Sequence, residues 1–282
     1  MNNGYALVTG ASTGIGHACA SALADKGFHV FAGVRRETDG ERIRKESAGK
    51  VEPIMLDVTN PEHIAAAKQH ITEVAGEKGL RGLVNNAGIA VAAPLEFVPM
   101  ADFELQMNVN VKGLLAVTQA FLPLLRVASG RLCLISSTNG FFALPFMGPY
   151  SASKFAVEAL GDSLRVELAP WNIRVSIVQP GAIQTPIWEK SKAANEAMLN
   201  RMPAECHALY GKAIDVMRRE AEKMANRAAP ASRVADCVVH AITAAKPKTR
   251  YLCGGGARME WLVARWMPDS LRDRIIRMVI GI

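Results

Sequence analysis

A tyrosine and a lysine stand four residues apart in the segment YSASK, which holds Tyr150 and Lys154. On a helix, residues i and i+4 share one face, so the phenol and the ammonium group would lie side by side. A nearby positive charge favours the phenolate and lowers the pKa of a tyrosine from its usual value of about 10. The pair therefore predicts a proton donor and acceptor near neutral pH, although two unrelated helix residues would show the same spacing.

Three glycines, Gly10, Gly14 and Gly16, lie in the segment TGASTGIG, directly after the apolar run Tyr5–Val8. Their spacing differs from the G-x-G-x-x-G fingerprint of dinucleotide-binding proteins. Gly10 would allow a tight turn after a strand, and the other two would remove side chains where a helix begins. Because the N–H groups and dipole of a helix start attract phosphate, the segment predicts a pyrophosphate cradle. A plain glycine-rich turn between a strand and a helix is the alternative.

Strand and helix patterns alternate around these residues. The expected strands are Tyr5–Val8, His29–Val34, Val51–Leu56, Gly82–Asn85, Arg131–Ser136, Ile173–Val178 and Thr249–Cys253. The expected helices are Ile15–Lys26, Arg42–Glu46, about 59–75, Asp102–Leu125, Tyr150–Leu168 and Val234–Ala244. Short apolar strands without alternation are typical of a parallel sheet covered on both faces. The order predicts an α/β protein with a Rossmann-type, doubly wound parallel sheet.

In such a fold, ligands bind beyond the carboxyl ends of the strands. Those ends carry Gly10, Arg35, Asp57, Asn86, Ser137 and Pro180. The chain of 282 residues is 50% hydrophobic, and we expect one domain over residues 1–282. The polar, helical segment 187–227 interrupts the strand–helix rhythm, which predicts a mobile lid over residues 186–228 before the last helix and strand. Residues 255–282 would form a C-terminal extension.

The composition of the chain indicates its cellular compartment and the classes of partner that it binds. Five scattered cysteines without a C-x-x-C spacing indicate reduced thiols in the cytoplasm, with no disulfide framework and no metal site. The net charge of +7 suits an anionic ligand or an acidic membrane surface, whereas the short basic clusters disfavour nucleic acid. We expect no membrane-spanning helix, since no run of 18 apolar residues occurs. We also expect no signal peptide or anchor before the first strand.

Further motifs follow other strands in a recognisable order. Ser137 lies in LISSTNG, thirteen residues before Tyr150; NNAG covers Asn85–Gly88; NVNVKG contains Asn110; and PGAIQTP covers Pro180–Pro186. Together with TGASTGIG and YSASK, they closely resemble the short-chain dehydrogenase/reductase family. The resemblance covers Ala6–Thr185 and extends to about residue 254. The segment after Ser137 and the C-terminal segment are similar to the retinol- and steroid-dehydrogenase-like branch.

The resemblance implies a catalytic set. Tyr150 would be the acid–base residue, Lys154 would tune it and bind the nicotinamide ribose, and Ser137 would hydrogen-bond the substrate oxygen. Asn110 would hold a water in a proton relay; a polar helix residue bonded to nearby backbone is the alternative. Ser136 is the rival of Ser137, but the thirteen-residue spacing favours the latter. Hydride would pass between the nicotinamide and a carbonyl carbon, with Tyr150 supplying the proton.

The resemblance also implies a cofactor site. Its expected residues are Gly10, Ser12, Thr13, Gly14, Ile15, Gly16, Arg35, Asp57, Val58, Asn86, Ala87, Gly88, Tyr150, Lys154, Pro180, Gly181, Ile183 and Thr185. Val34 stands where an acid that would receive the ribose of NAD is expected, and Arg35 follows it. We therefore expect NADP(H), with NAD(H) as the alternative. Many NADP-dependent relatives also have a basic residue where this chain has Thr13, and the Ser12 and Thr13 hydroxyls would partly substitute for it. The alternative is that Arg35 and Arg36 are solvated loop charges.

The substrate is expected to be a bulky hydrophobic alcohol or ketone of steroid, retinoid or lipid type. Ser137, Phe142, Leu144, Tyr150 and Trp188 would line its pocket, although the apolar residues could equally be core. A 3-ketoacyl thioester reductase and a non-catalytic nucleotide-binding sensor are the alternatives. The C-terminal tail would contact a membrane, pack on the core or contact a second subunit. We expect a homodimer or homotetramer.

Overall fold

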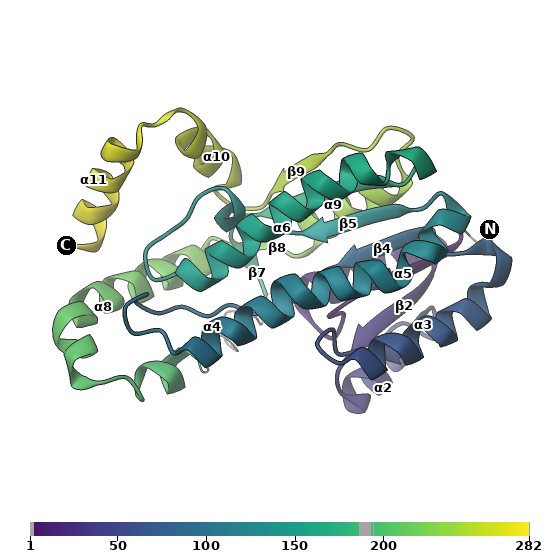
Figure 1. The fold of residues 1–282 in the computed structure, drawn as a ribbon, viewed down its shortest axis with the longest axis horizontal. Helices are drawn as coiled ribbons and strands as arrows, with labels where there is room; N and C mark the ends of the chain where they lie inside the picture. Colours follow the sequence, from purple (N-terminus) through teal and green to yellow (C-terminus); the bar gives the residue numbers. More distant parts are fainter. Residues whose placement is uncertain (1–2, 186–192, 194, 282) are drawn as a thin grey trace.

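A parallel sheet of seven strands forms the centre of the protein. The computed structural model describes residues 3–185, 193 and 195–281. The strands are β1 (Tyr5–Val8), β2 (His29–Val34), β3 (Val51–Met55), β4 (Gly82–Asn85), β5 (Arg131–Ile135), β6 (Arg174–Pro180) and β9 (Arg250–Cys253). They lie in the order β3-β2-β1-β4-β5-β6-β9, and every pairing is parallel. Figure 1 shows the sheet between its flanking helices. The predicted α/β fold is confirmed.

The strand order reverses beside β1. From β1 the chain first builds outward to β2 and β3, then returns to place β4 on the other side of β1. The loops after β1 and β4 therefore diverge from neighbouring strand ends, which is where doubly wound sheets bind ligands. Gly10 and Asn86 follow these two strands.

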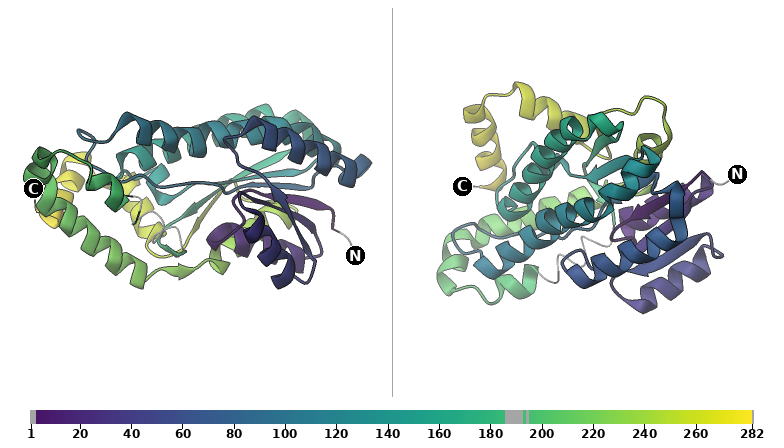
Figure 2. Two further views of the ribbon diagram at one scale, coloured as in Figure 1. Left: turned by 90° about the horizontal axis from the view of Figure 1, so that it is seen from below. Right: turned by 45° about the vertical axis from the view of Figure 1, so that its right-hand side comes forward.

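Helices cover both faces of the sheet (Figure 2). One face carries α1 (Gly14–Asp25), α2 (Glu37–Glu46) and α9 (Ser232–Thr243), whose apolar side chains pack with Val8, Val30 and Val178. The other face carries α3 (Pro61–Ala75), α5 (Leu114–Ala128) and α6 (Gly148–Glu167), packed with Leu7, Leu83 and Leu134. Two apolar layers thus hold the strand ends in fixed positions.

The long helix expected over Asp102–Leu125 is instead three consecutive pieces. It consists of α4 (Met100–Met107), a π-helical segment (Asn108–Gly113) and α5. A run of apolar residues at helical spacing does not distinguish a π turn from an α turn. Within the described residues, Met100–Ala128 is one helical stretch long and apolar enough to cross a membrane by length and composition. In this fold Val117, Phe121 and Leu125 of that stretch are fully buried in the core.

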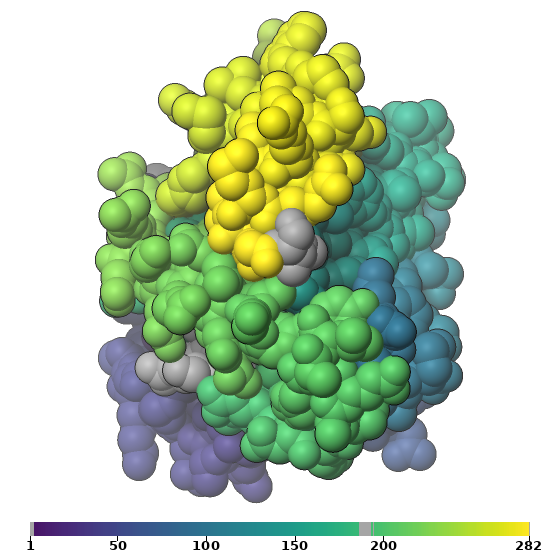
Figure 3. All heavy atoms as spheres, turned by 90° about the vertical axis from the view of Figure 1, so that its left-hand side faces the viewer, coloured from purple at the N-terminus to yellow at the C-terminus, as the bar shows by residue number. Residues whose placement is uncertain are grey.

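The segments after β6 extend beyond the sheet. The two short strands β7 (Ile183–Gln184) and β8 (Ala229–Pro230) pair with each other on either side of the lid segment, which contains α8 (Ala204–Asn226). After β9 the chain forms α10 (Ala257–Trp266) and α11 (Asp269–Ile280). Figure 3 shows the C-terminal helices, in yellow, against the green lid segment. Helix α9 and strand β9 lie close to their predicted bounds.

Candidate active site

The glycine-rich loop after β1 has a backbone that other residues could not follow easily. Gly10 and Gly14 have φ angles of +63° and +59°. A Cβ atom on Gly16 would lie 2.5 Å from the side-chain nitrogen of Asn86. These glycines are therefore needed for a turn and for close packing, and the loop leads directly into the N-terminus of α1.

The start of α1 has the character of an anion-binding site. Thr13, at the N-cap, makes no side-chain capping bond within the described part of the chain, and the first turn holds no acidic residue. The first N–H groups of a helix lack partners inside the helix, so they are available to a ligand beside Ser12, Thr13 and Ile15. The residues present thus fit the pyrophosphate of a dinucleotide, as the sequence predicts.

The loop after β4 is tied to the glycine-rich loop. The side-chain nitrogen of Asn86 donates to the carbonyl oxygens of Thr9 (2.9 Å) and Gly10 (3.1 Å). The hydroxyl of Thr9 accepts from the main-chain nitrogens of Asn86 (2.9 Å) and Ala87 (3.0 Å). The expected cofactor residues Asn86, Ala87 and Gly88 therefore lie beside the first loop. Thr9, which the sequence reasoning missed, links the two loops.

Basic side chains gather where β2 meets α2. Arg35 is exposed, whereas the guanidinium of Arg36 pairs with Asp39 at 2.9 Å. Arg42 was not anticipated: it donates to the carbonyl oxygen of Ser12 in the glycine-rich loop and pairs with Glu46 at 2.9 Å. Arg42 thus anchors the loop from a helix thirty residues away in sequence, which a motif search cannot detect.

Asp57 follows β3 and lies beside the same region. Its carboxylate accepts from the main-chain nitrogen (2.9 Å) and hydroxyl (2.7 Å) of Thr59. Partial burial raises the pKa of Asp57, but the Thr59 bonds and the nearby Arg35 outweigh it and lower the pKa overall. The next residue, Val58, is buried against Gly113. Asp57 is therefore ionised at neutral pH and is held in a fixed orientation.

Ser137 and Tyr150 meet at the carboxyl end of β5. A hydrogen bond with Ser137 lowers the pKa of Tyr150, but desolvation of the phenol is the larger effect and raises the pKa overall. This direction is opposite to the predicted lowering by Lys154. The Ser137 hydroxyl accepts from the main-chain nitrogen of Asn139 at 3.1 Å. The hydroxyl of Ser136 is buried without a hydrogen-bond partner among the described residues, and Ser137 is the serine that contacts Tyr150.

Lys154 lies one helical turn from Tyr150, as its spacing predicts. Its ammonium nitrogen lies 5.7 Å from the centroid of the Tyr150 ring and donates to the carbonyl oxygen of Ile135 at 2.8 Å. Burial lowers the pKa of Lys154 to about 8, although the charge of Glu158 opposes the shift. A buried lysine with one main-chain partner has donor capacity left for a ligand.

Asn110 is fixed inside the π-helical segment. Its amide oxygen accepts from the main-chain nitrogen of Ile89 at 2.9 Å, and its amide nitrogen donates to Ile89 (3.1 Å) and to the Ser153 hydroxyl (3.0 Å). π-helical turns occur frequently at functional sites. The side chain thus bonds to backbone, as the structural alternative predicts, and connects the loop after β4 to α6.

The motif after β6 lies against the end of β9. The main-chain nitrogen of Gly181 donates to the carbonyl oxygen of Cys253 at 2.8 Å, and that of Ala182 donates to Gly255 at 3.2 Å. Pro180 ends β6, Ile183 is buried in the core and Thr185 is half-buried. The Ser137 hydroxyl lies 3.5 Å from the carbonyl oxygen of Pro180, so this motif adjoins the Ser137–Tyr150 pair.

The expected substrate residues are only partly placed. Phe142 lies below the guanidinium of Arg272 at 5.7 Å, and Leu144 is half-buried in the same loop. Trp188 lies outside the described residues. Met198, an apolar residue of the lid segment, packs in a separate apolar cluster with Val91. The structure therefore places Phe142 and Leu144 on the connection between Ser137 and Tyr150, near the C-terminal helices.

Known proteins are similar to this chain in sequence and in fold. The short chain dehydrogenase family profile matches residues 4–196. Retinol dehydrogenase 16 of Homo sapiens is 36% identical over 281 residues, which cover 98% of this chain and 88% of that protein. Retinol dehydrogenase 5 of Mus musculus is 34% identical over 285 residues, covering 99% and 89%. A short chain dehydrogenase from Burkholderia cenocepacia J2315, solved in complex with NADP, aligns with a TM-score of 0.73 at 26% identity, covering 97% and 98%.

Proposed function

We propose, from the premise that the chain belongs to the short chain dehydrogenase family, that it interconverts a hydrophobic alcohol and its carbonyl compound with NADP(H). As a member of this family, the protein is an NAD(P)-dependent oxidoreductase that acts on alcohols. The preferred cofactor, the substrate and the roles of individual residues are our proposals. The observation that carries the proposal is the meeting of Ser137 with Tyr150, one helical turn from Lys154, beside the Pro180 motif.

The geometry supports a different role in the reaction for each of three side chains. Tyr150 would donate a proton to the carbonyl oxygen in reduction and recover it in oxidation. Its raised pKa keeps the phenol protonated at neutral pH, which suits proton donation. The Ser137 hydroxyl would donate to the same substrate oxygen and stabilise negative charge there. The Lys154 ammonium, held at the Ile135 carbonyl, would stabilise the phenolate and bind a ribose hydroxyl.

The dinucleotide would lie across the switch point of the sheet. The free N–H groups of α1 would bind its pyrophosphate, and Arg35 would contact the 2′-phosphate of NADP(H). When bound, the cofactor supplies the hydride. The structural neighbour complexed with NADP supports this choice, as does the absence of an acid at Val34.

A hydrophobic substrate is supported by the retinol dehydrogenase relatives and by the apolar Phe142–Leu144 connection. The test is a panel of retinoids, steroids, long-chain alcohols and 3-ketoacyl thioesters, each assayed with NADPH or NADP⁺ by cofactor absorbance. Turnover of a retinoid, steroid or long-chain alcohol would support the proposal. Turnover confined to ketoacyl thioesters would replace the substrate class, and cofactor binding without turnover of any compound would favour a sensor.

We further propose that the protein is cytoplasmic and touches an acidic membrane surface through α10 and α11. Eight exposed large apolar side chains lie on these helices: Met259, Trp261, Leu262, Trp266, Leu271, Ile275, Met278 and Val279. Their sequence also contains five arginines against three acidic residues. Exposed apolar and aromatic residues beside arginines suit the interface of a bilayer with anionic lipids.

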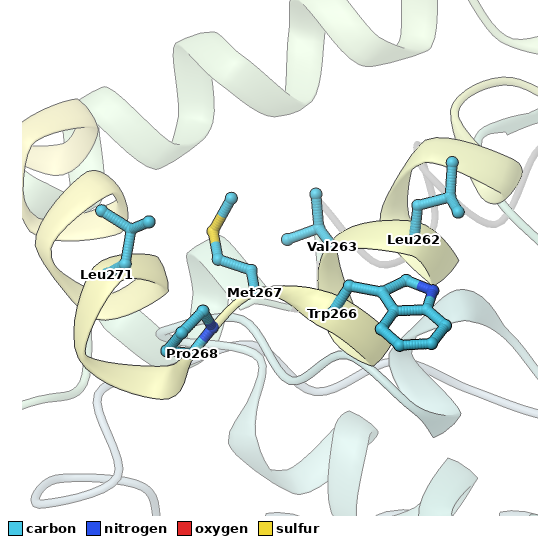
Figure 4. Close-up of a pocket in the computed structure, with 6 residues that line it drawn as sticks. All are labelled: Leu262, Val263, Trp266, Met267, Pro268 and Leu271. Atoms are coloured by element: carbon cyan, nitrogen blue, oxygen red, sulfur yellow. The ribbon is translucent and has the colours of Figure 1, made fainter.

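The junction of the two helices is an open apolar hollow of about 340 Å³. Figure 4 shows the side chains that line it: Leu262, Val263, Trp266, Met267, Pro268 and Leu271. None of the proposed catalytic residues lines this hollow. Within the described residues, Leu271, Ile275, Met278 and Val279 are exposed, which suits contact with a membrane or with a second subunit. The arginines favour the membrane.

A further inference from the structure

Four of the five cysteines gather on one face of the sheet. Cys19, Cys133 and Cys253 belong to the same buried apolar cluster, and the half-buried Cys237 packs against it. Cys237 comes from α9 and Cys253 from the end of β9. Both line a hollow of about 630 Å³, so two thiols from different elements face one solvent-connected space.

The two thiols differ in a way that suits stepwise oxidation. A hydrogen bond from the Cys253 thiol lowers the pKa of Cys237 overall, despite partial burial and the charge of Asp236. The same contact, together with burial, raises the pKa of Cys253. Burial raises the pKa of Cys19 to about 12, and it also raises that of Cys133. Cys237 is also the one thiol of these four that is only half-buried, so it is the thiol that a peroxide reaches from the hollow, and we take it as the nucleophile.

The end of β9 is coupled to the motif after β6. The carbonyl oxygen of Cys253 accepts from the main-chain nitrogen of Gly181 at 2.8 Å. The next residue, Gly254, has a φ of +87°, and a Cβ there would lie 2.6 Å from the Cδ1 atom of Ile183. A change at Cys253 therefore has little room to relax without moving the segment that contains Gly181 and Ile183.

We propose that Cys237 and Cys253 form a peroxide-sensitive disulfide site whose oxidation weakens cofactor binding. The Cys237 thiolate attacks a peroxide oxygen; an S–O bond forms, the O–O bond breaks, and the departing oxygen is protonated and leaves. The Cys253 sulfur then attacks the sulfenic sulfur; the S–S bond forms, the S–O bond breaks, and water leaves with the Cys253 proton. The two thiols lose two electrons, which reduce the peroxide.

The cross-link does not depend on the proposed function, but its effect on cofactor binding does. The test treats the folded, full-length protein with hydrogen peroxide, blocks the remaining thiols with N-ethylmaleimide and digests with trypsin. Cleavage after Arg233, Lys248, Arg250 and Arg258 places each cysteine in its own peptide, 234–248 and 251–258. We expect these peptides joined, with the mass of two hydrogens lost, and separated again by dithiothreitol.

Cysteine variants distinguish a specific Cys237–Cys253 disulfide from unspecific oxidation of the other cysteines. Cys206→Ser changes the cysteine that lies outside the cluster and should cross-link as the wild type does. Cys253→Ser should accumulate a sulfenic acid on Cys237 that dimedone traps. A persistent Cys237 sulfenic acid in the wild type, a bond from Cys237 to Cys19, or no oxidation of Cys237 in the folded protein would each overturn the site.

The effect of the disulfide on cofactor binding is measured separately. The Kd for NADPH and NADH, measured by fluorescence before and after peroxide, should rise several-fold on oxidation. Dithiothreitol should reverse the change, and Cys237→Ser should not show it. A cross-link that leaves both Kd values unchanged would overturn the coupling. Failure of the reduced protein to bind either cofactor would instead count against the proposed function, and the peptide masses would still decide the disulfide.

Discussion

The ammonium nitrogen of Lys154 donates a hydrogen bond of 2.8 Å to the carbonyl oxygen of Ile135, at the end of β5. This contact holds the charge next to the strand that leads into Ser137. It also keeps the lysine in a buried position, where desolvation favours its neutral form.

Cofactor binding should take up a proton at alkaline pH. The pKa of Lys154 is about 8 in the free protein, below its ordinary value, so the ammonium group is lost as pH rises through that value. A ribose hydroxyl that binds the ammonium raises the pKa again, so NADPH affinity should fall above pH 8. Calorimetry in buffers of different ionisation enthalpy measures the uptake. Lys154→Met should abolish it; identical uptake in that variant would contradict the assignment.

Tyr150→Phe should fold and bind cofactor but lose turnover by about 10²–10⁴-fold, because the proton donor is removed.

Ser137→Ala should also reduce kcat, through loss of a donor to the substrate oxygen. Ser136→Ala is the matched control, since the hydroxyl of Ser136 is buried without a partner in the described residues. Steady-state kinetics measures all three. A larger loss in Ser136→Ala than in Ser137→Ala would reverse the choice between the two serines.

Arg35→Ala should weaken NADPH binding by about 1.5–3 kcal/mol, the usual worth of a hydrogen bond to a charged group, and NADH binding much less. Arg42→Ala should weaken both cofactors similarly, because Arg42 holds the Ser12 carbonyl in the glycine-rich loop. Fluorescence titration gives the four Kd values. Equal affinity of the wild type for both cofactors would refute the proposed NADP(H) preference.

Trp266→Ala should reduce binding to vesicles containing phosphatidylserine. Its side chain is 74% exposed and lies beside the hollow between α10 and α11. Trp171→Ala, which changes an exposed tryptophan near β6, should bind as the wild type does. Sedimentation with vesicles of phosphatidylserine or phosphatidylcholine makes the comparison. A concentration-dependent dimer that Trp266→Ala abolishes, without vesicle binding by the wild type, would show that a second copy covers this face.

The lid segment should exchange amide hydrogens faster without substrate than with it. In the described region, Asn195 of this segment bonds to the main chain of Ala90 (3.4 Å) and Ala92 (3.2 Å), and Tyr210 donates to Glu96 at 2.7 Å. The segment is also attached through the apolar cluster in which Met198 packs with Val91, and that cluster lies apart from the two layers that cover the sheet. Asn195→Ala should speed exchange over residues 204–226 further. Strong protection in the free protein, unchanged by a bound substrate, would make this segment a fixed part of the fold.

The strand ends were predictable because local signals agree there. An apolar run followed by Gly10, Asn86 or Pro180 marks the end of a buried strand, and in a doubly wound fold the loops after such strands are where we propose that the ligand binds. The thirteen-residue spacing likewise pointed to Ser137. These features need no knowledge of the tertiary structure.

Other features depend on contacts that sequence spacing does not reveal. Arg42 reaches Ser12 from another helix. The pKa of Tyr150 rises because its surroundings remove water, an effect that the spacing to Lys154 does not report. Residues 255–282 were expected only as an extension whose apolar residues a membrane, the core or a second subunit would cover. That these residues are exposed on α10 and α11 follows from the tertiary structure and not from their spacing.

The π-helical segment over Asn108–Gly113 makes the position of the neighbouring side chains depend on the number of residues in this segment. The hydrogen bond of a π turn spans one residue more than that of an α turn, so α4 and α5 are rotated relative to the phase of one continuous helix. Deleting a single residue here would restore that phase and swing Asn110 away from Ile89, even if no functional side chain were removed. In an alignment, a one-residue gap at this position would therefore mark a more altered protein than many substitutions nearby.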